Sequence, residues 1–452
     1  MNRILRIGGA CLNQIPMDWK HNSKNIKNAF QEAQKNNVAL LCLPELCITG
    51  YGCEDMFLST WLCETAQTKL IELLPFTTGL TTCLGLPVRF KSQVYNCIAI
   101  VKNKRILGIY AKHNLANDGI HYEKRWFSSW PYHKIENLKI ADQTIQIGAI
   151  SLEINNLKIG FEICEDAWQK DRPANIFATQ GIDLILNPSA SHFAFEKEKY
   201  REQLVIDSSK KFSCTYLYTN LLGNEAGRMI YDGDVLIAQK GKLIGHNTRF
   251  SFKPFNILYC DVNFDLQTSS LNIREDYEGK LEEMSQVLPL ALFDYLIKSK
   301  SKGFVLSLSG GADSGTIAVM VRRMVDLAIE ELGIENVKEK LGLSADILNA
   351  KDIMASIMIT AYQGTQNSSV ETASAARNLA EFIGSTHYEW DIDIQVKGYC
   401  DTIENAIGRK LTWDQDDITL QNIQARSRSP IIWMLANINH SLLLTTSNRS
   451  EG

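Results

Sequence analysis

The sequence predicts an α/β protein of two domains, in which strands alternate with helices. Two observations carry this prediction. Short apolar runs, typical of buried strands, alternate with segments whose apolar residues recur at helical spacing, both before residue 265 and after residue 285. Between them, residues 266–284 are polar and show no long apolar period, which predicts a linker. The predicted domains are therefore residues 1–265 and 285–452.

In the first domain, a helix is predicted over residues 23–36, with Asn22 or Ser23 as its N-cap, because apolar residues recur there every three or four positions. A second helix is predicted over residues 196–211. Residues 234–245 are predicted to form a hairpin that turns at Lys240-Gly241. Strands are predicted in four apolar runs, over residues 38–46, 157–164, 182–192 and 215–220. Polar residues cluster at the ends of these strands, where open α/β sheets bind ligands.

The second domain is predicted to begin with a helix over residues 288–300 and a strand over residues 303–309. A glycine-rich turn and a helix over residues 316–332 follow, and further strands are expected at 357–362, 386–392 and 441–447. This alternation predicts a parallel, doubly wound sheet. Only about four strands are present, whereas such sheets usually have five or six. The sequence is therefore expected to be the front portion of a longer protein.

The composition argues against several classes of function. The formal net charge of −4 and the absence of a basic stripe argue against binding to nucleic acid or to a membrane surface. The first residues do not resemble a signal peptide, since Arg6 interrupts a short apolar stretch. No apolar run approaches the ~20 residues of a spanning helix, and an odd number of cysteines, eleven, argues against a disulfide framework. We therefore expect a soluble, cytoplasmic protein.

Three polar residues stand where strands of the first domain should end. They are Glu45 in LPELCITGYG, Lys112 in YAKHNLAND and Cys164 in GFEICEDAW. A strand-end cysteine is more often a small buried hydrophobe than a nucleophile, but the three together favour chemistry. A carboxylate can take the thiol proton, and an ammonium can stabilise the thiolate and an oxyanion. Glu123 in HYEKRWF can hold the lysine, so the set predicts amide hydrolysis through a thioester.

These stretches, together with NPSASHF, resemble the nitrilase or carbon–nitrogen hydrolase superfamily with its Glu-Lys-Cys triad. The resemblance covers residues 1 to about 265 and implies a nitrilase-like α-β-β-α sandwich. It implies Cys164 as the acyl-accepting nucleophile, with Ser191 and Lys197 as contacts of a glutamine substrate. Where the family often has an aromatic residue, this chain has Asp118.

The stretch SLSGGADSG follows a predicted strand and opens a helix, which is typical of a phosphate-binding loop. Glycines there expose backbone N–H groups to an anion, hydroxyls add donors, and Asp313 is suited to Mg²⁺. A glycine-rich turn that merely caps a helix is the alternative. The motif lacks the G-K-[ST] of a Walker A loop and instead resembles the pyrophosphate loop of N-type ATP pyrophosphatases. The predicted ATP-binding residues are Ser307, Leu308, Ser309, Gly310, Gly311, Ala312, Asp313 and Ser314.

Three further stretches, at residues 365–384, 420–431 and 443–452, resemble the NAD synthetase family. The resemblance implies a Rossmann-like second domain of the adenine nucleotide alpha hydrolase type. It implies that Asn422 and Arg426 bind deamido-NAD and that Thr446 contacts ATP. It also implies that Glu451 serves the dinucleotide and, with Asp313, Mg²⁺. Taken alone, the arginines of NIQARSR indicate only a solvated helix face.

The two resemblances together imply an enzyme that hydrolyses glutamine and uses the ammonia to amidate deamido-NAD, with ATP split into AMP and pyrophosphate. Its substrates are then glutamine, ATP and deamido-NAD, with Mg²⁺ and no prosthetic group, in a homo-oligomer of two or more subunits. One alternative is a related fusion enzyme that amidates another carboxylate. The other is a nucleotide-sensing or scaffolding module with a dead site. NIQARSR disfavours the first, and the intact motifs disfavour the second.

Overall fold

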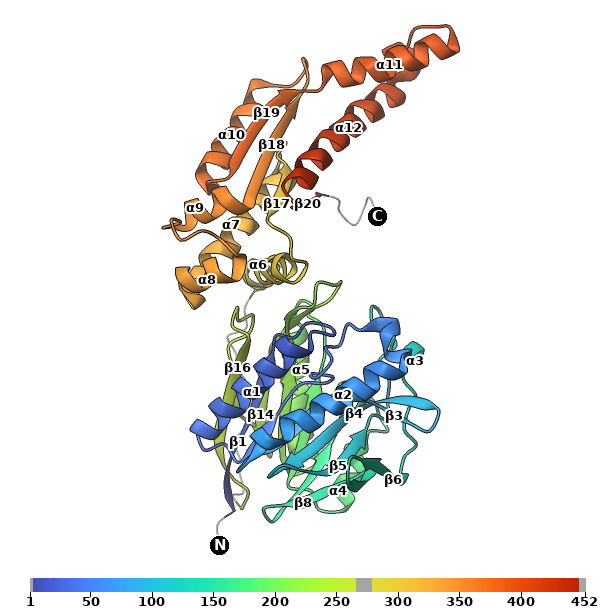
Figure 1. The fold of residues 1–452 in the computed structure, drawn as a ribbon, viewed down its shortest axis with the longest axis vertical. Helices are drawn as coiled ribbons and strands as arrows, with labels where there is room; N and C mark the ends of the chain where they lie inside the picture. The colour runs from blue at the N-terminus through green and yellow to red at the C-terminus, as the bar shows by residue number, and fades with distance from the viewer. Residues whose placement is uncertain (1–2, 266–278, 447–452) are drawn as a thin grey trace. The chain divides into compact units, whose positions relative to one another are not determined.

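The computed structural model describes residues 3–265 and 279–446 (Figure 1). The chain divides into two compact units, Met1–Ala291 and Leu292–Gly452. Within the described ranges, no helix is both long and apolar enough to cross a membrane.

The first unit contains two large sheets. One has eight strands, in the order β16 (Phe255–Asn263), β1 (Ile4–Leu12), β2 (Leu40–Cys42), β3 (Thr81–Phe90), β4 (Gln93–Lys102), β5 (Arg105–Ala111), β7 (Gln143–Gly148) and β6 (Ile135–Ile140). The other has six, in the order β15 (Lys242–His246), β14 (Val235–Gln239), β11 (Thr215–Asn220), β10 (Leu184–Ser189), β9 (Leu157–Phe161) and β8 (Leu152–Ile154). A separate hairpin joins β12 (Leu222–Asn224) to β13 (Ile230–Asp232).

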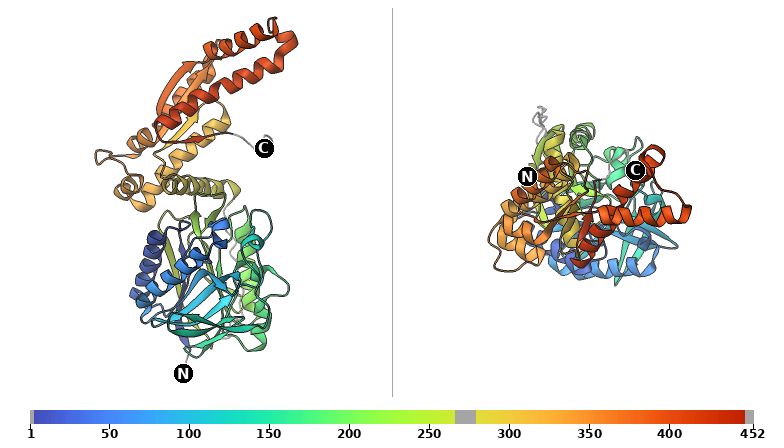
Figure 2. Two further views of the ribbon diagram at one scale, coloured as in Figure 1. Left: turned by 45° about the vertical axis from the view of Figure 1, so that its right-hand side comes forward. Right: turned by 90° about the horizontal axis from the view of Figure 1, so that it is seen from above.

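The two large sheets pack face to face, since β1 and β2 contact β10, β11 and β14. The outer faces carry helices: α1 (Trp19–Lys35) and α2 (Thr60–Leu73) on the first sheet, and α4 (Pro173–Thr179) and α5 (Lys197–Lys211) on the second (Figures 1 and 2). Sheets covered on both faces need strands that are apolar throughout, and β2, β10 and β11 are buried along their whole length. The predicted α-β-β-α sandwich is confirmed.

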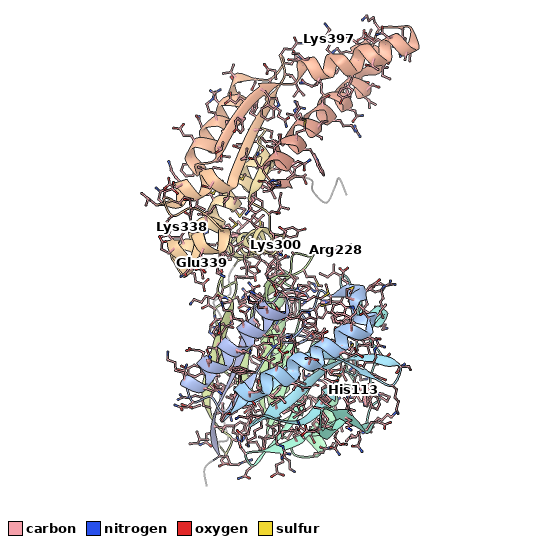
Figure 3. The ribbon with its side chains drawn as sticks, in the orientation of Figure 1. His113, Arg228, Lys300, Lys338, Glu339 and Lys397 are labelled. Carbon is pink, nitrogen blue, oxygen red and sulfur yellow. The ribbon has the colours of Figure 1, made fainter. Side chains whose placement is uncertain are left out.

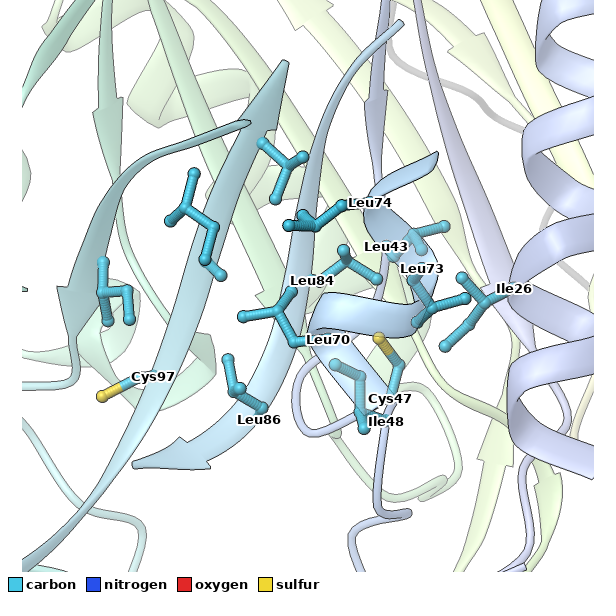
Figure 4. Close-up of a cluster of buried hydrophobic side chains, with 14 of the residues drawn as sticks. Ile26, Leu43, Cys47, Ile48, Leu70, Leu73, Leu74, Leu84, Leu86 and Cys97 are labelled. Carbon is cyan, nitrogen blue, oxygen red and sulfur yellow. The ribbon is translucent and has the colours of Figure 1, made fainter. Parts of the chain in front are cut away.

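A hydrophobic core lies between the eight-stranded sheet and the helices α1 and α2 (Figure 4). Ile26 of α1, Leu70 of α2 and Leu84 of β3 all belong to it and are fully buried. Leu43 and Cys47, which flank Glu45 in the chain, belong to the same cluster. Burying a leucine side chain stabilises a fold by about 1.5–3 kcal/mol, so this core holds the loop that carries Glu45 firmly against β3.

The second unit is built on a four-stranded parallel sheet in the order β19 (Thr386–Asp391), β18 (Met358–Gly364), β17 (Phe304–Ser307) and β20 (Leu442–Leu444). The predicted parallel α/β sheet is therefore confirmed. The chain leaves β17 toward β18 on one side, and β20 pairs on the other, so the end of β17 is a topological switch point. Helix α6 (Lys280–Lys298) begins in the first unit and ends in the second. The other described helices of the second unit are α7 (Ala312–Leu332), α8 (Ile334–Leu341), α9 (Ala350–Ile357), α10 (Val370–Ile383), α11 (Asp393–Ile407) and α12 (Trp413–Ile438).

Several predicted boundaries are corrected by the structure. Helix α1 starts at Trp19 rather than near residue 23, because the Asp18 carboxylate accepts from the His21 N–H and caps the helix there. Helix α6 starts at Lys280 rather than at residue 288, and Glu283 of its first turn is buried against Arg249. The hairpin is confirmed, with Lys240 and Gly241 both at positive φ.

Candidate functional site

The Lys112 side chain lies between two carboxylates in the interior of the first unit. Its Nζ is 2.6 Å from Glu45 Oε1 and 2.9 Å from Glu123 Oε1, and all three residues are fully buried. Lys112 follows β5 directly, Glu45 lies in the loop after β2, and Glu123 opens the short helix α3 (Glu123–Trp126). The structure thus brings together three of the four residues that the sequence singled out, from elements far apart in the chain.

The carboxylate oxygens are satisfied by groups that the sequence did not indicate. Asn96 of β4 donates to Glu45 Oε1 at 2.6 Å, and the Ala190 N–H donates to Glu45 Oε2 at 2.8 Å. Tyr51 OH donates to Glu123 Oε1 at 2.9 Å. Tyr51 stands six residues after Glu45, in the stretch PELCITGYG, and this nearness was the only sequence signal for it. A buried ion pair destabilises the fold unless its remaining polar atoms are hydrogen-bonded. These three bonds pair the carboxylate oxygens and so reduce the free-energy cost of burying the charges.

Cys164 begins a 3₁₀ turn, Cys164–Trp168, rather than ending a strand as predicted, because β9 stops at Phe161. Its backbone has φ of +43°, a conformation that residues other than glycine, asparagine and aspartate rarely adopt. The Cys164 N–H donates to Asn187 Oδ1 at 3.1 Å, which helps to hold the turn. A backbone held at positive φ is strained. Strain of this kind persists only where the surrounding structure imposes it, and it is concentrated at functional sites.

Burial and charge set the ionisation of the site. Burial, reinforced by the Glu45 carboxylate and opposed by Lys112, raises the pKa of the Cys164 thiol to about 12. Burial also raises the pKa of Glu45 to about 7, although the Lys112 ammonium acts against it. Burial alone would lower the pKa of Lys112, but the carboxylates of Glu123 and Glu45 outweigh it and raise that pKa well above its usual range. At neutral pH the thiol is therefore protonated and a partly ionised base faces the ammonium.

The two acids that follow Cys164 in the chain, Glu165 and Asp166, form hydrogen bonds outside the Glu45–Lys112–Glu123 network. Asp166 accepts from Tyr110 OH at 3.1 Å and from the backbone N–H groups of Ile163, His113 and Asn114 at 3.0, 3.2 and 2.8 Å. Its carboxylate therefore ties the cysteine turn to the loop after β5, where His113 is labelled in Figure 3. The Glu165 side chain accepts from the Gln169 side chain, and burial raises its pKa.

The two residues predicted to contact glutamine lie beyond β10. Ser191 is buried, and its backbone N–H donates to Asn220 Oδ1 at 2.8 Å. Lys197 is the first residue of α5, and its Nζ donates to the His192 carbonyl at 2.9 Å. Burial and the nearby Arg201 guanidinium lower the pKa of Lys197.

A pocket of about 540 Å³ opens beside this network. Tyr51, which donates to Glu123, is part of its wall, and Glu225 accepts from the Tyr51 and Gly52 backbone N–H groups at 2.9 and 2.7 Å. Further residues of the wall are Trp126, Arg228 (labelled in Figure 3) and Tyr231. The pocket has the size expected for a small-molecule site.

The predicted phosphate loop in the second unit follows β17 at the switch point and leads into α7, a helix of 21 residues. Gly310 has φ of +79°, and a Cβ there would lie 2.3 Å from the Thr372 carbonyl oxygen, so only glycine fits. Ser314 Oγ lies 3.2 Å from the Ser309 N–H and 3.1 Å from Ser309 Oγ. A backbone folded this way, at a helix N-terminus, suits an anion.

The remaining predicted residues of this unit are placed only in part. Thr446 follows β20, whose Leu444 pairs with Leu306 of β17, so it leaves the sheet beside the loop. Arg426 and Asn422 lie on α12, where Arg426 Nη1 donates to Asn422 Oδ1 at 2.9 Å, and both are exposed. Asp313 is exposed in the first turn of α7, and its carboxylate is a hard oxygen ligand that suits Mg²⁺. Glu451, its predicted partner, lies outside the described residues.

Comparison with known proteins covers both units. Residues 7–269 match the carbon–nitrogen hydrolase family, and residues 284–452 match the NAD synthase family. A glutamine-dependent NAD⁺ synthetase from Oryza sativa subsp. indica is 31% identical over the whole of this chain, which spans 71% of that protein.

Two solved structures carry the same fold. A glutamine-dependent NAD⁺ synthetase from Cytophaga hutchinsonii is 49% identical, with a TM-score of 0.91 over 99% of this chain and 75% of its own. A glutamine-dependent NAD⁺ synthetase from Acinetobacter baumannii, solved with ADP, is 23% identical, with a TM-score of 0.78 over 99% of this chain and 75% of its own. The chain therefore belongs to the glutamine-dependent NAD⁺ synthetase family.

Proposed function

We propose that this chain hydrolyses glutamine in its first unit and uses the released ammonia to amidate deamido-NAD, at the expense of ATP, in its second. The observation that carries the first step is the fully buried Glu45–Lys112–Glu123 network. Its charges act directly on the ionisation of Cys164. A buried thiol with such neighbours is suited to acyl transfer rather than to packing alone.

In the proposed glutamine step, Glu45 takes the Cys164 thiol proton as the sulfur attacks the side-chain amide carbon. The Lys112 ammonium and the Glu165 N–H stabilise the oxyanion that forms. Glu45 then returns the proton to the amide nitrogen, the carbon–nitrogen bond breaks, and ammonia leaves a thioester on Cys164. Glu45 takes a proton from water as the water oxygen attacks the thioester carbon, and it passes that proton to the departing thiolate. The new carboxylic acid then gives its proton to Glu45, which leaves glutamate, the free thiol and a protonated Glu45. Glu123 keeps Lys112 in place throughout, since it bonds the same ammonium.

Glutamine is proposed to enter through the 540 Å³ pocket, whose wall includes Tyr51. Ser191 and Lys197 are proposed to contact it. Lys197 provides a positive charge suited to the α-carboxylate of an amino acid. Its Nζ is already directed at the backbone of His192, two residues after Ala190, whose N–H bonds Glu45.

In the proposed synthetase step, the loop Ser307–Ser314 cradles the ATP phosphates, and Thr446 contacts the nucleotide beside it. The nicotinate carboxylate of deamido-NAD, held with the help of Asn422 and Arg426, attacks the α-phosphorus and displaces pyrophosphate. Ammonia then attacks the adenylated carbonyl carbon, which yields NAD⁺ and AMP. Asp313 and Glu451 would hold Mg²⁺, which offsets the phosphate charge when bound.

Three expectations from the sequence stay predictions: domain limits at residues 265 and 285, assembly as a homo-oligomer, and a cytoplasmic location. The first is supported by the family matches to residues 7–269 and 284–452. Size-exclusion chromatography with light scattering tests the second, since a monomer at all concentrations would contradict it.

The experiment that tests the proposed function supplies ATP, Mg²⁺ and deamido-NAD with either glutamine or an ammonium salt, and follows glutamate and NAD⁺ separately. Wild type is expected to form both products from glutamine. Cys164→Ala is expected to lose glutamate and glutamine-dependent NAD⁺ but to retain ammonium-dependent NAD⁺. Cys260→Ala, which removes a half-buried thiol from β16, is the matched control and should behave as wild type.

Each contrary result has a distinct meaning. Glutamate without NAD⁺ from either nitrogen source would contradict the synthetase step for this chain. Glutamate formation that survives Cys164→Ala would contradict the proposed nucleophile. NAD⁺ formed equally well from a carboxylate other than deamido-NAD would contradict the proposed acceptor.

A further inference from the structure

A chain of hydrogen bonds leads away from Glu123 through residues that the proposed reaction does not use. Tyr51 OH, which donates to Glu123 Oε1 at 2.9 Å, is also 3.0 Å from His121 Nδ1. His121 Nε2 is in turn 2.8 Å from His192 Nδ1. Tyr51 and Glu123 are fully buried or nearly so, whereas His121 and His192 are half-buried. The chain therefore runs from the interior of the site toward the surface.

Counting protons fixes the direction of these bonds. The Tyr51 hydroxyl has one proton, which goes to Glu123, so His121 Nδ1 must donate to the Tyr51 oxygen. Burial lowers the pKa of His121 to about 4, and burial with the Lys197 charge does the same for His192. Both rings are therefore neutral near pH 7, and His121 Nε2 can only accept a proton from His192 Nδ1. Each member thus has one donor and one acceptor in line. In this resting arrangement the donors point toward Glu123, so transfer in the outward direction needs the opposite tautomer of both rings.

The chemistry of the site creates a proton that has to leave. Hydrolysis of an amide to a carboxylate and neutral ammonia releases one proton: RCONH₂ + H₂O gives RCOO⁻, NH₃ and H⁺. Ammonia that carried this proton away would be ammonium, which has no lone pair to attack an adenylate. The new carboxyl group does not retain it either, because its ordinary pKa is about 4. The proton must therefore pass from the reaction centre to solvent by another path.

We propose that Tyr51, His121 and His192 form this path and carry the proton released by each turnover from Glu123 to solvent. The inference rests on the proposed glutamine hydrolysis. Glu45, when protonated, gives its proton to Lys112 as Lys112 gives one of its own to Glu123, across the 2.6 and 2.9 Å bonds. The net result is a protonated Glu123, with Lys112 still an ammonium.

From there the transfer proceeds along the chain. Before this transfer the Tyr51 hydroxyl rotates toward His121, and the two half-buried rings exchange tautomer with water. Tyr51 O–H then points to His121 Nδ1, His121 Nε2–H points to His192 Nδ1, and His192 holds a proton on Nε2. Glu123 gives its proton to the Tyr51 oxygen, the Tyr51 proton moves to His121, the His121 Nε2 proton moves to His192 Nδ1, and the His192 Nε2 proton enters water. The final arrangement is the one observed, with Tyr51 donating to an ionised Glu123. The hydroxyl rotation and the tautomer exchange repeat before the next turnover.

The test uses the full chain and compares His121→Gln and His192→Gln with wild type. Glutamate formation from glutamine is measured at pH 7 in dilute buffer, with and without added imidazole. Both variants are expected to show kcat lower by about tenfold to a hundredfold, with unchanged KM for glutamine, and to recover as imidazole is added. His246→Gln, which alters an exposed histidine at the end of β15, is the matched control.

The outcomes separate the relay from a structural role and from the proposed function itself. Variants with wild-type kcat in dilute buffer would overturn the relay. A loss of kcat that imidazole does not restore would also overturn it, because a packing defect is insensitive to a diffusible proton carrier. Should His121→Gln fail to fold, the half-buried His192→Gln decides the matter alone. A wild-type chain that forms no glutamate would instead overturn the proposed glutamine hydrolysis.

Discussion

The ionisation of Glu45 is expected to control the pH dependence of glutamine hydrolysis. The pKa of the Cys164 thiol is about 12, so only on the order of one thiol in 10⁵ is ionised at neutral pH. The reaction therefore needs a base to take the thiol proton, and Glu45, with a pKa of about 7, is proposed to be that base. Only the ionised form of Glu45 can act, so the activity falls as the pH drops below about 7.

The magnitude follows from the fraction of Glu45 that is ionised. Below about pH 7, kcat/KM should fall by about tenfold for each pH unit, because kcat/KM reports the free enzyme. Glu45→Gln should lower kcat by about 10² to 10⁴-fold, the usual contribution of a general base, and should abolish the acidic limb. The exposed Glu153→Gln on β8 is the control and should retain the wild-type profile.

A second readout checks the same ionisation without catalysis. The folded pKa of Glu45, about 7, lies above its ordinary value of 4.5, so the folded state holds this proton more tightly than the unfolded state. The resulting stabilisation is fully present below pH 4.5 and is lost as the pH rises through 7. At roughly 1.4 kcal/mol per pH unit it amounts to about 3 kcal/mol. Urea unfolding of wild type, measured relative to Glu45→Gln, should show this decline.

The assay is the initial rate of glutamate formation at low glutamine concentration across the acid and neutral range. An acidic limb centred near pH 4.5, the ordinary value for a glutamate, would refute the argument that burial dominates over Lys112. A Glu45→Gln enzyme whose rate still rises with pH across the same range would also refute the argument, since the acidic limb of the pH profile would then belong to another group.

Three further predictions concern single substitutions. Lys112→Met should lower the free energy of unfolding by about 3–5 kcal/mol in urea titrations, because it leaves two buried carboxylates without their cation. A loss below about 1 kcal/mol, the range of a surface ion pair, would contradict the buried network of Lys112 with Glu45 and Glu123. Gly85→Ala should lower the kcat of glutamate formation by about a hundredfold, because the added Cβ would lie 2.2 Å from the Leu46 nitrogen and displace the loop that carries Glu45. An unchanged kcat would contradict this, since it would show that the loop can shift without disturbing the position of Glu45. Asp313→Asn should abolish ammonium-dependent NAD⁺ formation but leave glutamate formation unchanged, because Asp313 lies in the second unit; equal loss of both products would argue against separate sites.

Much of the site was predictable because its signals are local. Glu45, Lys112 and Cys164 each follow an apolar strand, and the glycine-rich stretch from Ser307 to Ser314 lies between a strand and a helix. The turn at Lys240-Gly241 could be placed for the same reason, since residues adjacent in the chain decide a hairpin. The sequence indicated a strand end at Lys112, but the ranges and pairing of the strands from β3 to β8, β5 before Lys112 included, went unpredicted, because they depend on partners in other segments. The start of α6 was misplaced for a related reason, as Glu283 is paired with Arg249, far away in sequence.

What the sequence determined by itself is the chemical inventory: a carboxylate, an amine and a thiol at strand ends, and a phosphate loop between strand and helix. Only the tertiary structure decided which groups act on one another. The acids that follow Cys164 in the chain, Glu165 and Asp166, are not the charges that most affect its thiol. Those charges are Glu45 and Lys112, which follow the distant strands β2 and β5. The relay from Tyr51 through His121 to His192 likewise joins three separate segments. The physical reason is that burial and hydrogen bonding depend on distance in space, and distance in space is set by how the two sheets pack.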